Sequence, residues 1–117
     1  MKLANMFRGL AHAIFGWGFI QIILIGFAYF NAIPSSYHGY SGLLLEVMAL
    51  LLLVVALFGR MGGKLIGLSL LLLVLLGGQG FFVHSPDLAP LVRGLHPVFG
   101  ITSMLLARYL AGQAPQS

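Results

Sequence analysis

Hydrophobic residues form four long runs along the chain, and the short stretches before and between them hold most of the charges and prolines. The runs cover about residues 10–30, 37–58, 65–83 and 91–110. Each approaches the roughly 20 residues with which an α-helix crosses the hydrocarbon core of a bilayer. The pattern therefore predicts a single membrane domain over residues 1–117, all-α, with four transmembrane helices and no soluble domain.

The connections between the runs are short, and this sets the arrangement of the helices. Links of a few residues make successive helices antiparallel, so we expect an up-down-up-down four-helix bundle. The fourth helix begins either near His96 or near Pro90 with a kink at Pro97, and we favour the second start because it gives the longer span. The glycine-rich segment at residues 77–80 is expected to loosen the third helix.

Composition supports a membrane location. Hydrophobic residues make up 60% of the chain and charged residues only 7%, against roughly 25% charged residues in a soluble domain. A bilayer accepts apolar side chains directly, whereas water would not. No small-x-small cleavage site follows the first run, so we do not expect it to be a removable signal sequence.

The charges predict an orientation. Positive residues gather on one side of the predicted bundle, and the other side holds only Asp87 and Arg93. On the assumption that this is an integral protein of a bacterial plasma membrane, the positive-inside rule then predicts both termini and the middle loop in the cytoplasm. Because the charge is spread over short loops, we expect no nucleic-acid partner. The residues on the positive side are Lys2, Arg8, Arg60, Lys64 and Arg108.

Two short strings recur at a fixed distance. His38-Gly39-Tyr40-Ser41-Gly42 and His96-Pro97-Val98-Phe99-Gly100 are both His-x-x-x-Gly, and 58 residues separate them. The same offset relates Gln21 to Gln79. Recurrence of the rare residue types of an apolar chain predicts a duplicated helical hairpin, with its halves related by rotation about the membrane normal.

The repeated histidines suit a haem iron. Bis-histidine ligation needs imidazoles that project inward from facing helices. His38 opens the second predicted helix and His96 the fourth, so they lie at one depth on diagonal helices. Gly42 and Gly100 lie one turn deeper on the same faces, where a missing side chain gives the macrocycle room. We expect one haem b with His38 and His96 as its metal ligands; the competing interpretation is interfacial histidines and a glycine packing motif.

Other polar residues are candidates for contact with this cofactor. Gln21 and Gln79 face inward, either for hydrogen bonds between helices or to contact the ligand. Arg93 could pair with a haem propionate. His84, whose counterpart in the first half is Gly26, either borders the haem or lies at the membrane interface. The chain has no cysteine, which excludes c-type haem attachment and iron–sulfur clusters.

Two further ionisable residues leave the chemistry open. Glu46 is the only acid inside a predicted span, and it could relay protons, contact a quinone headgroup or form a structural hydrogen bond. His12 has no histidine partner on the cytoplasmic side. A second bis-histidine haem is therefore not expected.

The layout resembles a family of small bacterial four-span membrane proteins whose activity is not established. The matches are Gln21, Gln79, His38 and the string Leu95-His96-Pro97-Val98-Phe99-Gly100. More distantly, the chain is similar to one four-helix half of haem A synthase. That likeness implies haem between His38 and His96. The chain has one such half and no catalytic acid near these histidines, so the oxidation of a farnesylated haem is not carried over.

The function that these residues favour is electron transfer by a cytochrome b-like protein near the outer face, with a quinone or a redox protein as partner. A haem carrier or sensor fits the same site. Two other classes stay open: a small proton-coupled transporter that uses Glu46, and a non-catalytic subunit of a membrane complex. The residues do not decide whether the protein is an enzyme, and a homo-oligomer is compatible with them.

Overall fold

The chain folds entirely into helices. The computed structural model describes residues 2–116, and this part of the chain contains no strand. Four long helices and one short one follow each other in the order α1 (Lys2–Tyr29), α2 (Ser36–Phe58), α3 (Gly63–His84), α4 (Pro90–Arg93) and α5 (His96–Gln113). The all-α class predicted from the hydrophobic runs is confirmed.

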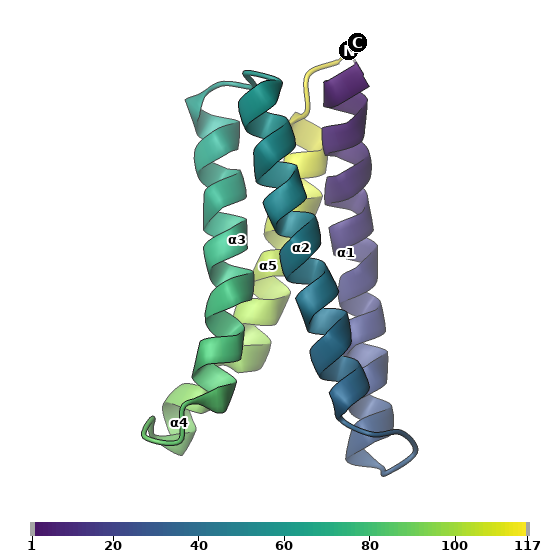
Figure 1. Cartoon of the computed structure of the whole chain (residues 1–117), viewed down its shortest axis with the longest axis vertical. Helices are drawn as coiled ribbons and strands as arrows, with labels where there is room; N and C mark the ends of the chain where they lie inside the picture. The colour runs from purple at the N-terminus through teal and green to yellow at the C-terminus, as the bar shows by residue number, and fades with distance from the viewer. Residues whose placement is uncertain (1, 117) are drawn as a thin grey trace.

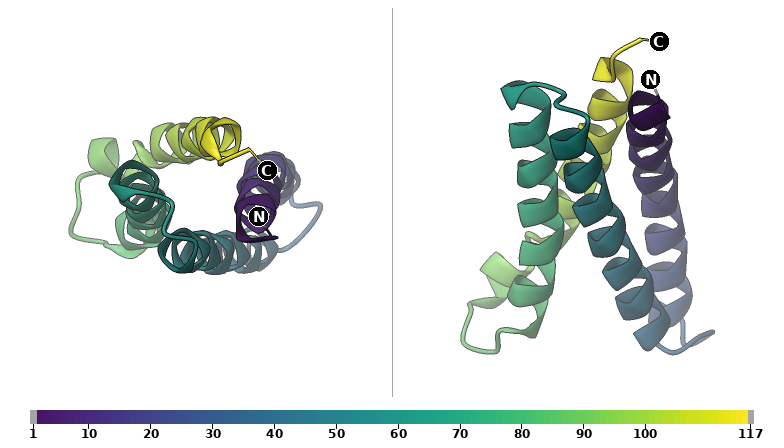
Figure 2. Two further views of the ribbon diagram at one scale, coloured as in Figure 1. Left: turned by 90° about the horizontal axis from the view of Figure 1, so that it is seen from above. Right: turned by 45° about the horizontal axis from the view of Figure 1, so that its top comes forward.

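The four long helices form one bundle. Successive long helices run in opposite directions, and the two chain ends lie together at one end of the bundle (Figure 1). Seen along the bundle, the helices close into a ring (Figure 2, left). Around it α1 packs against α2 and α5, and α3 packs against the same two helices. The helices α2 and α5 are therefore diagonal, as the sequence predicts for the second and fourth runs.

The first helix is longer than its hydrophobic run. It begins at Lys2 rather than near residue 10, because residues 2–9 contain no proline and a helix tolerates the single Gly9. Arg8 lies on this added part, and its guanidinium donates hydrogen bonds to the carbonyl oxygens of Ala114 (3.4 Å) and Pro115 (3.1 Å). The polar start of α1 thus anchors the end of the chain.

The expected long fourth helix with a kink at Pro97 is wrong. Helix α4 is a single turn that ends at Arg93, and α5 begins separately at His96. Pro97 stands at the second position of α5, where its missing N–H needs no partner and its fixed φ suits a first turn. The glycines at residues 77–80 do not break α3, which runs continuously from Gly63 to His84.

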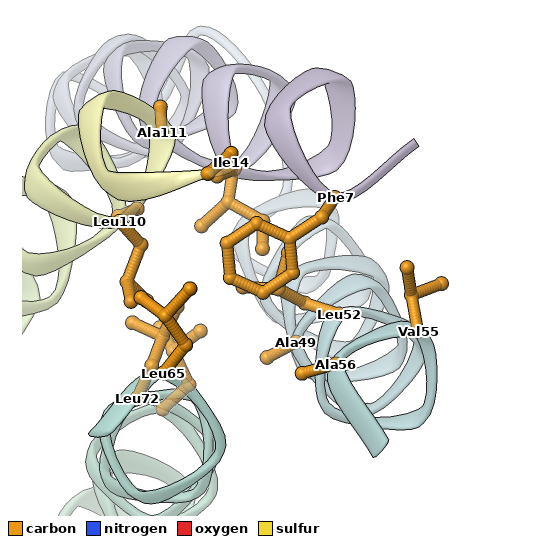
Figure 3. Packing of buried hydrophobic residues seen from close by; sticks show 14 of the residues in the cluster. Phe7, Ile14, Ala49, Leu52, Val55, Ala56, Leu65, Leu72, Leu110 and Ala111 are labelled. Atoms are coloured by element: carbon orange, nitrogen blue, oxygen red, sulfur yellow. The ribbon is translucent and has the colours of Figure 1, made fainter. Parts of the chain in front are cut away.

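The hydrophobic core lies at the end of the bundle that holds the termini. Phe7, Leu52, Leu72 and Leu110 are fully buried there and point toward one another (Figure 3). Small residues bring the backbones together between these large side chains. The buried alanines of this core are Ala11, Ala49, Ala56, Ala107, Ala111 and Ala114.

The offset of 58 residues also relates the buried faces of the helices. In α1 the buried positions include 7, 11, 14 and 18, and in α3 they are 65, 69, 72 and 76. In α2 positions 45, 49, 52 and 56 are buried, and so are positions 103, 107 and 110 of α5 and position 114 directly after it. The α1–α2 and α3–α5 hairpins therefore present the same register of side chains to their shared core.

The opposite end of the bundle is open. The α1–α2 hairpin diverges from α3 and α5 toward this end (Figure 1). None of residues 19–40 and 77–102 is buried. The packing that holds the hairpins together is thus concentrated in one half of the bundle, and the repeated histidines lie in the other.

The outer surface is strongly apolar. Helices α1, α2 and α3 are long and apolar enough to cross a membrane. Large side chains such as Ile23, Leu50 and Val74 are exposed on them, which is consistent with a membrane protein because lipid is the natural neighbour of such a surface. Helix α5 has 18 residues, about 27 Å at 1.5 Å per residue, and is not among these three.

Truncation of a side chain in this core should lower the free energy of unfolding more than truncation of an exposed side chain. Leu52 and Leu110 are fully buried at equivalent positions of α2 and α5. Leu52→Ala and Leu110→Ala should each lower the free energy of unfolding by roughly 2–5 kcal/mol, because each leaves a cavity. Thermal unfolding in detergent, followed by circular dichroism, measures the effect. Leu51→Ala and Leu105→Ala remove exposed side chains and serve as controls; equal losses in both pairs would contradict the assignment of the core.

Candidate functional site

His38 and His96 meet at the open end of the bundle. Each lies in the first turn of its helix, α2 or α5, and each is half-buried. Their ring centroids are 6.1 Å apart and the ring planes are inclined by 85°. Two residues separated by 58 positions on diagonal helices are thus brought together with their ring planes nearly perpendicular, at the one depth that the repeated motif predicts.

The His38 ring is held by a backbone carbonyl of α1. Its Nδ1 atom lies 3.1 Å from the carbonyl oxygen of Gln21. With the proton on Nδ1 the ring donates to this oxygen, and the lone pair of Nε2 stays free. Metal-ligating histidines are oriented in this way, with one ring N–H on a carbonyl and the other nitrogen on the metal.

A hydrogen-bond network ties the same turn of α2 to α1. In the orientation that satisfies both ends of its amide, Gln21 donates to the carbonyl oxygen of His38 (3.1 Å) and to Oγ of Ser41 (2.8 Å), and accepts from the N–H of Gly42 (3.1 Å). Trp17 donates from Nε1 to Oγ of Ser41 at 2.7 Å. We call Trp17, Gln21, His38 and Ser41 the Gln21 network. It supplies hydrogen bonding between helices, one of the two roles that the sequence leaves open for Gln21.

The repeated glycines face the repeated glutamines. A Cβ atom on Gly42 would lie 3.0 Å from an amide atom of Gln21, and one on Gly100 would lie 3.4 Å from Oε1 of Gln79. The space over both glycines, expected to serve a macrocycle, therefore contains glutamine amides. A flat ligand against these faces would have to displace both amides, and displacing that of Gln21 would break its bonds to His38, Ser41 and Gly42.

The surroundings of His96 differ from those of His38. Its Nδ1 atom is buried and has no hydrogen-bond partner. The positions equivalent to Trp17 and Ser41 are Leu75 and Phe99, which have no polar side-chain atoms. Phe99 instead stacks on Phe82 of α3, with centroids 5.2 Å apart and planes inclined by 10°. The second histidine thus lies in an apolar setting without the network that holds the first.

His96 borders an open pocket at the end of the bundle. The pocket has a volume of about 330 Å³ and is lined by Val83, Pro90, Arg93, Gly94, His96 and Pro97. Arg93 donates from its guanidinium to the carbonyl oxygen of Val83 at 3.1 Å. The structure thus brings Arg93 to the same pocket as His96. His84 is exposed and does not line this pocket.

The remaining ionisable candidates lie elsewhere. An oxygen of Glu46 would lie 3.9 Å from a Cβ atom on Gly80, so its side chain lies beside α3 and is not part of the Gln21 network. His12 lines a different pocket together with Arg8 and the chain end.

The histidine pair offers two donors to a metal. Among residues 2–116, no three side chains of His, Cys, Asp or Glu lie close enough together to hold an ion. A donor set of two imidazoles suits a metal that brings its other ligands with it, as iron does in a porphyrin.

Sequence reasoning missed two members of the network. Ser41 stands three residues after His38, and Trp17 stands four residues before Gln21, so each shares a helix face with a residue that the repeat had identified. Neither residue recurs in the second half, so a search for repeated residues does not find them. Their helical spacing from Gln21 and His38 could have identified both.

The bond between Trp17 and Ser41 can be tested by fluorescence, because Trp17 is the single tryptophan of the chain. Ser41→Ala should shift its emission to shorter wavelength and reduce stability by about 1 kcal/mol, since the indole N–H loses its acceptor. Ser69→Ala is the matched control, because the Ser69 hydroxyl bonds only within its own helix, to the carbonyl oxygen of Leu65 (2.8 Å). An unchanged spectrum for Ser41→Ala would contradict the network.

Comparison with known proteins identifies a family. No curated protein and no solved structure matches the chain. Residues 21–85 match a family of unknown function, DUF6220. The matched segment includes Gln21, His38, Gly42 and Gln79 and ends before His96. It agrees with the resemblance to a family without an established activity and does not bear on span number or on haem A synthase. Because the match covers more than half of its length, the chain belongs to the DUF6220 family.

Proposed function

We propose that the protein is a membrane cytochrome b-like protein that binds one haem b between His38 and His96 and transfers electrons near the outer face. The observation that carries the proposal is the approach of the two histidine rings, 6.1 Å apart, from diagonal helices. A quinone or a redox protein is the partner that such a site would serve.

The ring separation agrees with ligation of one metal by both imidazoles. Two imidazoles that held one metal between them, each through a bond of about 2 Å, would have their ring centroids about 6 Å apart. The observed 6.1 Å is close to this value. Each ring can turn about its bond to the metal, so an inclination of 85° is compatible with ligation. The same separation also suits packing of two aromatic rings, and the spectrum of the protein separates these interpretations.

The shape of the bundle supports a large flat ligand at this end. The two hairpins are packed tightly beside the termini and diverge toward the histidines (Figure 1). None of residues 19–40 and 77–102 is more than partly buried. A porphyrin between α2 and α5 would provide an apolar surface against which the diverging hairpins could pack. Arg93 beside His96 would provide a cation for a propionate.

The matching buried faces support a duplicated hairpin in the membrane. Two hairpins with one register of buried side chains form a bundle with pseudo-twofold symmetry about an axis parallel to the helices. We propose that all four long helices span a bacterial plasma membrane, α5 included, with both termini in the cytoplasm. The support for this orientation is the positive charge at the end of the termini and the middle loop.

Optical spectroscopy tests the haem. The protein expressed with ample haem and purified in detergent should show the low-spin spectrum of a six-coordinate b-type haem, in oxidised and reduced forms. His38→Ala and His96→Ala should each abolish the low-spin form, because each removes one of the two axial ligands. Gly42→Leu and Gly100→Leu should weaken haem binding at least tenfold, since their side chains fill the faces that the macrocycle needs.

His12→Ala is the matched control for these variants. It removes a histidine at the opposite end of the bundle, and the spectrum should stay unchanged. A colourless wild-type protein after expression with ample haem would refute the proposed function.

The membrane orientation is tested separately. The chain has no cysteine, so single cysteines can be introduced without a background. Ser36→Cys, at the start of α2, should react with an impermeant maleimide added outside intact cells. Gly62→Cys, in the loop between α2 and α3, should react only after the cells are opened, because the positive-inside rule places this loop in the cytoplasm. Labelling of both from the same side would refute the topology.

A further inference from the structure

We propose that the two histidines have unequal roles, His38 as the permanent ligand of the haem and His96 as an exchangeable one, so that a small diatomic gas binds the reduced iron in place of His96. This inference rests on the proposed function. It assigns to the site a second ligand, of the class of carbon monoxide, that enters from the pocket beside His96.

His38 is fixed by two bonds that do not involve the Gln21 amide. Its ring nitrogen Nδ1 is 3.1 Å from the backbone carbonyl oxygen of Gln21, which stays in place when the Gln21 side chain turns away from Gly42. Ser41, one turn along α2, accepts from Nε1 of Trp17. Rotation of the His38 ring would break the first of these bonds, and movement of its helical turn would break the second. A ligand with this support keeps its orientation when the other side of the metal changes.

His96 lacks every one of these constraints. Its Nδ1 atom is buried without a hydrogen-bond partner, although the equivalent bond in the first half joins His38 to Gln21. A buried polar atom without a partner is unfavourable, and a rotation that brings it to water or to another polar group removes that cost. His96 is also the first residue of α5, directly after the break that separates α5 from α4. Rotation of the His96 ring would thus relieve an unfavourable unpaired nitrogen, and few hydrogen bonds oppose it.

The pocket beside His96 offers space for the imidazole of His96 after its release. It also offers a small molecule access from outside the bundle. His96, Arg93 and Pro97 line this open pocket of about 330 Å³, whereas His38 does not. Most of the lining of the pocket is apolar, with Val83, Pro90 and Pro97 beside His96, which suits an uncharged diatomic molecule. In the haem-loaded protein the imidazole of His96 would leave and carbon monoxide would take its place, with no net transfer of protons or electrons.

Carbon monoxide itself is the probe. The detergent-purified protein is reduced with dithionite and titrated with carbon monoxide while the Soret band is recorded. We expect the wild type to form a carbon monoxide complex. His96→Ala should retain haem in a five-coordinate high-spin form and bind carbon monoxide at least tenfold more tightly, because no internal ligand competes. His38→Ala, the same change at the equivalent position, should lose most of its haem.

Added imidazole provides a second measurement. It should return His96→Ala to the low-spin spectrum and reduce its apparent affinity for carbon monoxide, because it occupies the position that His96 has left. Circular dichroism and Trp17 emission report whether His38→Ala remains folded without haem. If His38→Ala proves unfolded, the wild-type and His96→Ala titrations decide the question.

The outcomes separate this inference from the proposed function. A low-spin haem that does not react with carbon monoxide in the wild type, or equal haem loss in His38→Ala and His96→Ala, would overturn the unequal roles and leave the bis-histidine haem intact. A wild-type protein without haem would overturn both.

Discussion

Close packing at one end of the bundle is the constraint on which the rest of the structure depends. Phe7, Leu52 and Leu110 interlock there, and alanines between them let the four backbones approach. This core lies beside the termini. The opposite halves of the two hairpins contribute no buried residues to it, so the packing at the end of the termini is what holds them together. Their divergence, and the meeting of His38 and His96 across it, follow from a core that is confined to one half of the molecule.

The hydrogen bonds at the open end replace the apolar contacts that this end lacks. Gln21 joins α1 to the first turn of α2 through both its backbone carbonyl and its amide. In an apolar environment such bonds have no competition from water, so a few of them can fix a helix start. The polar residues of the open end therefore have a structural role in addition to the one that we propose for them.

Periodic features made much of the fold and site predictable, and the exceptions have local causes. The hydrophobic runs give the helices, and the offset of 58 residues brings His38 and His96 to one depth. The start of α5 depends on whether Pro97 lies in the first turn of a helix or inside one. The hydropathy of the segment is the same in both cases, so it could not distinguish the two starts. Trp17 and Ser41 have apolar counterparts, so their bond became visible only when α1 packed against α2. Such contacts depend on crossing angles and rotamers, which sequence spacing alone does not determine.

The shared register of the two hairpins has an evolutionary consequence. Two separate copies of one hairpin, paired by the same buried face, would form a symmetrical dimer in which both histidines have identical neighbours. Every mutation in such a dimer appears twice, so neither histidine can acquire a support that the other lacks. Once both hairpins belong to one polypeptide, each half mutates independently, and a Trp17–Ser41 pair can arise beside one histidine while Leu75 and Phe99 occupy the corresponding places beside the other. A single chain that carries both hairpins can thus give its two histidines different neighbours, which a symmetrical dimer cannot.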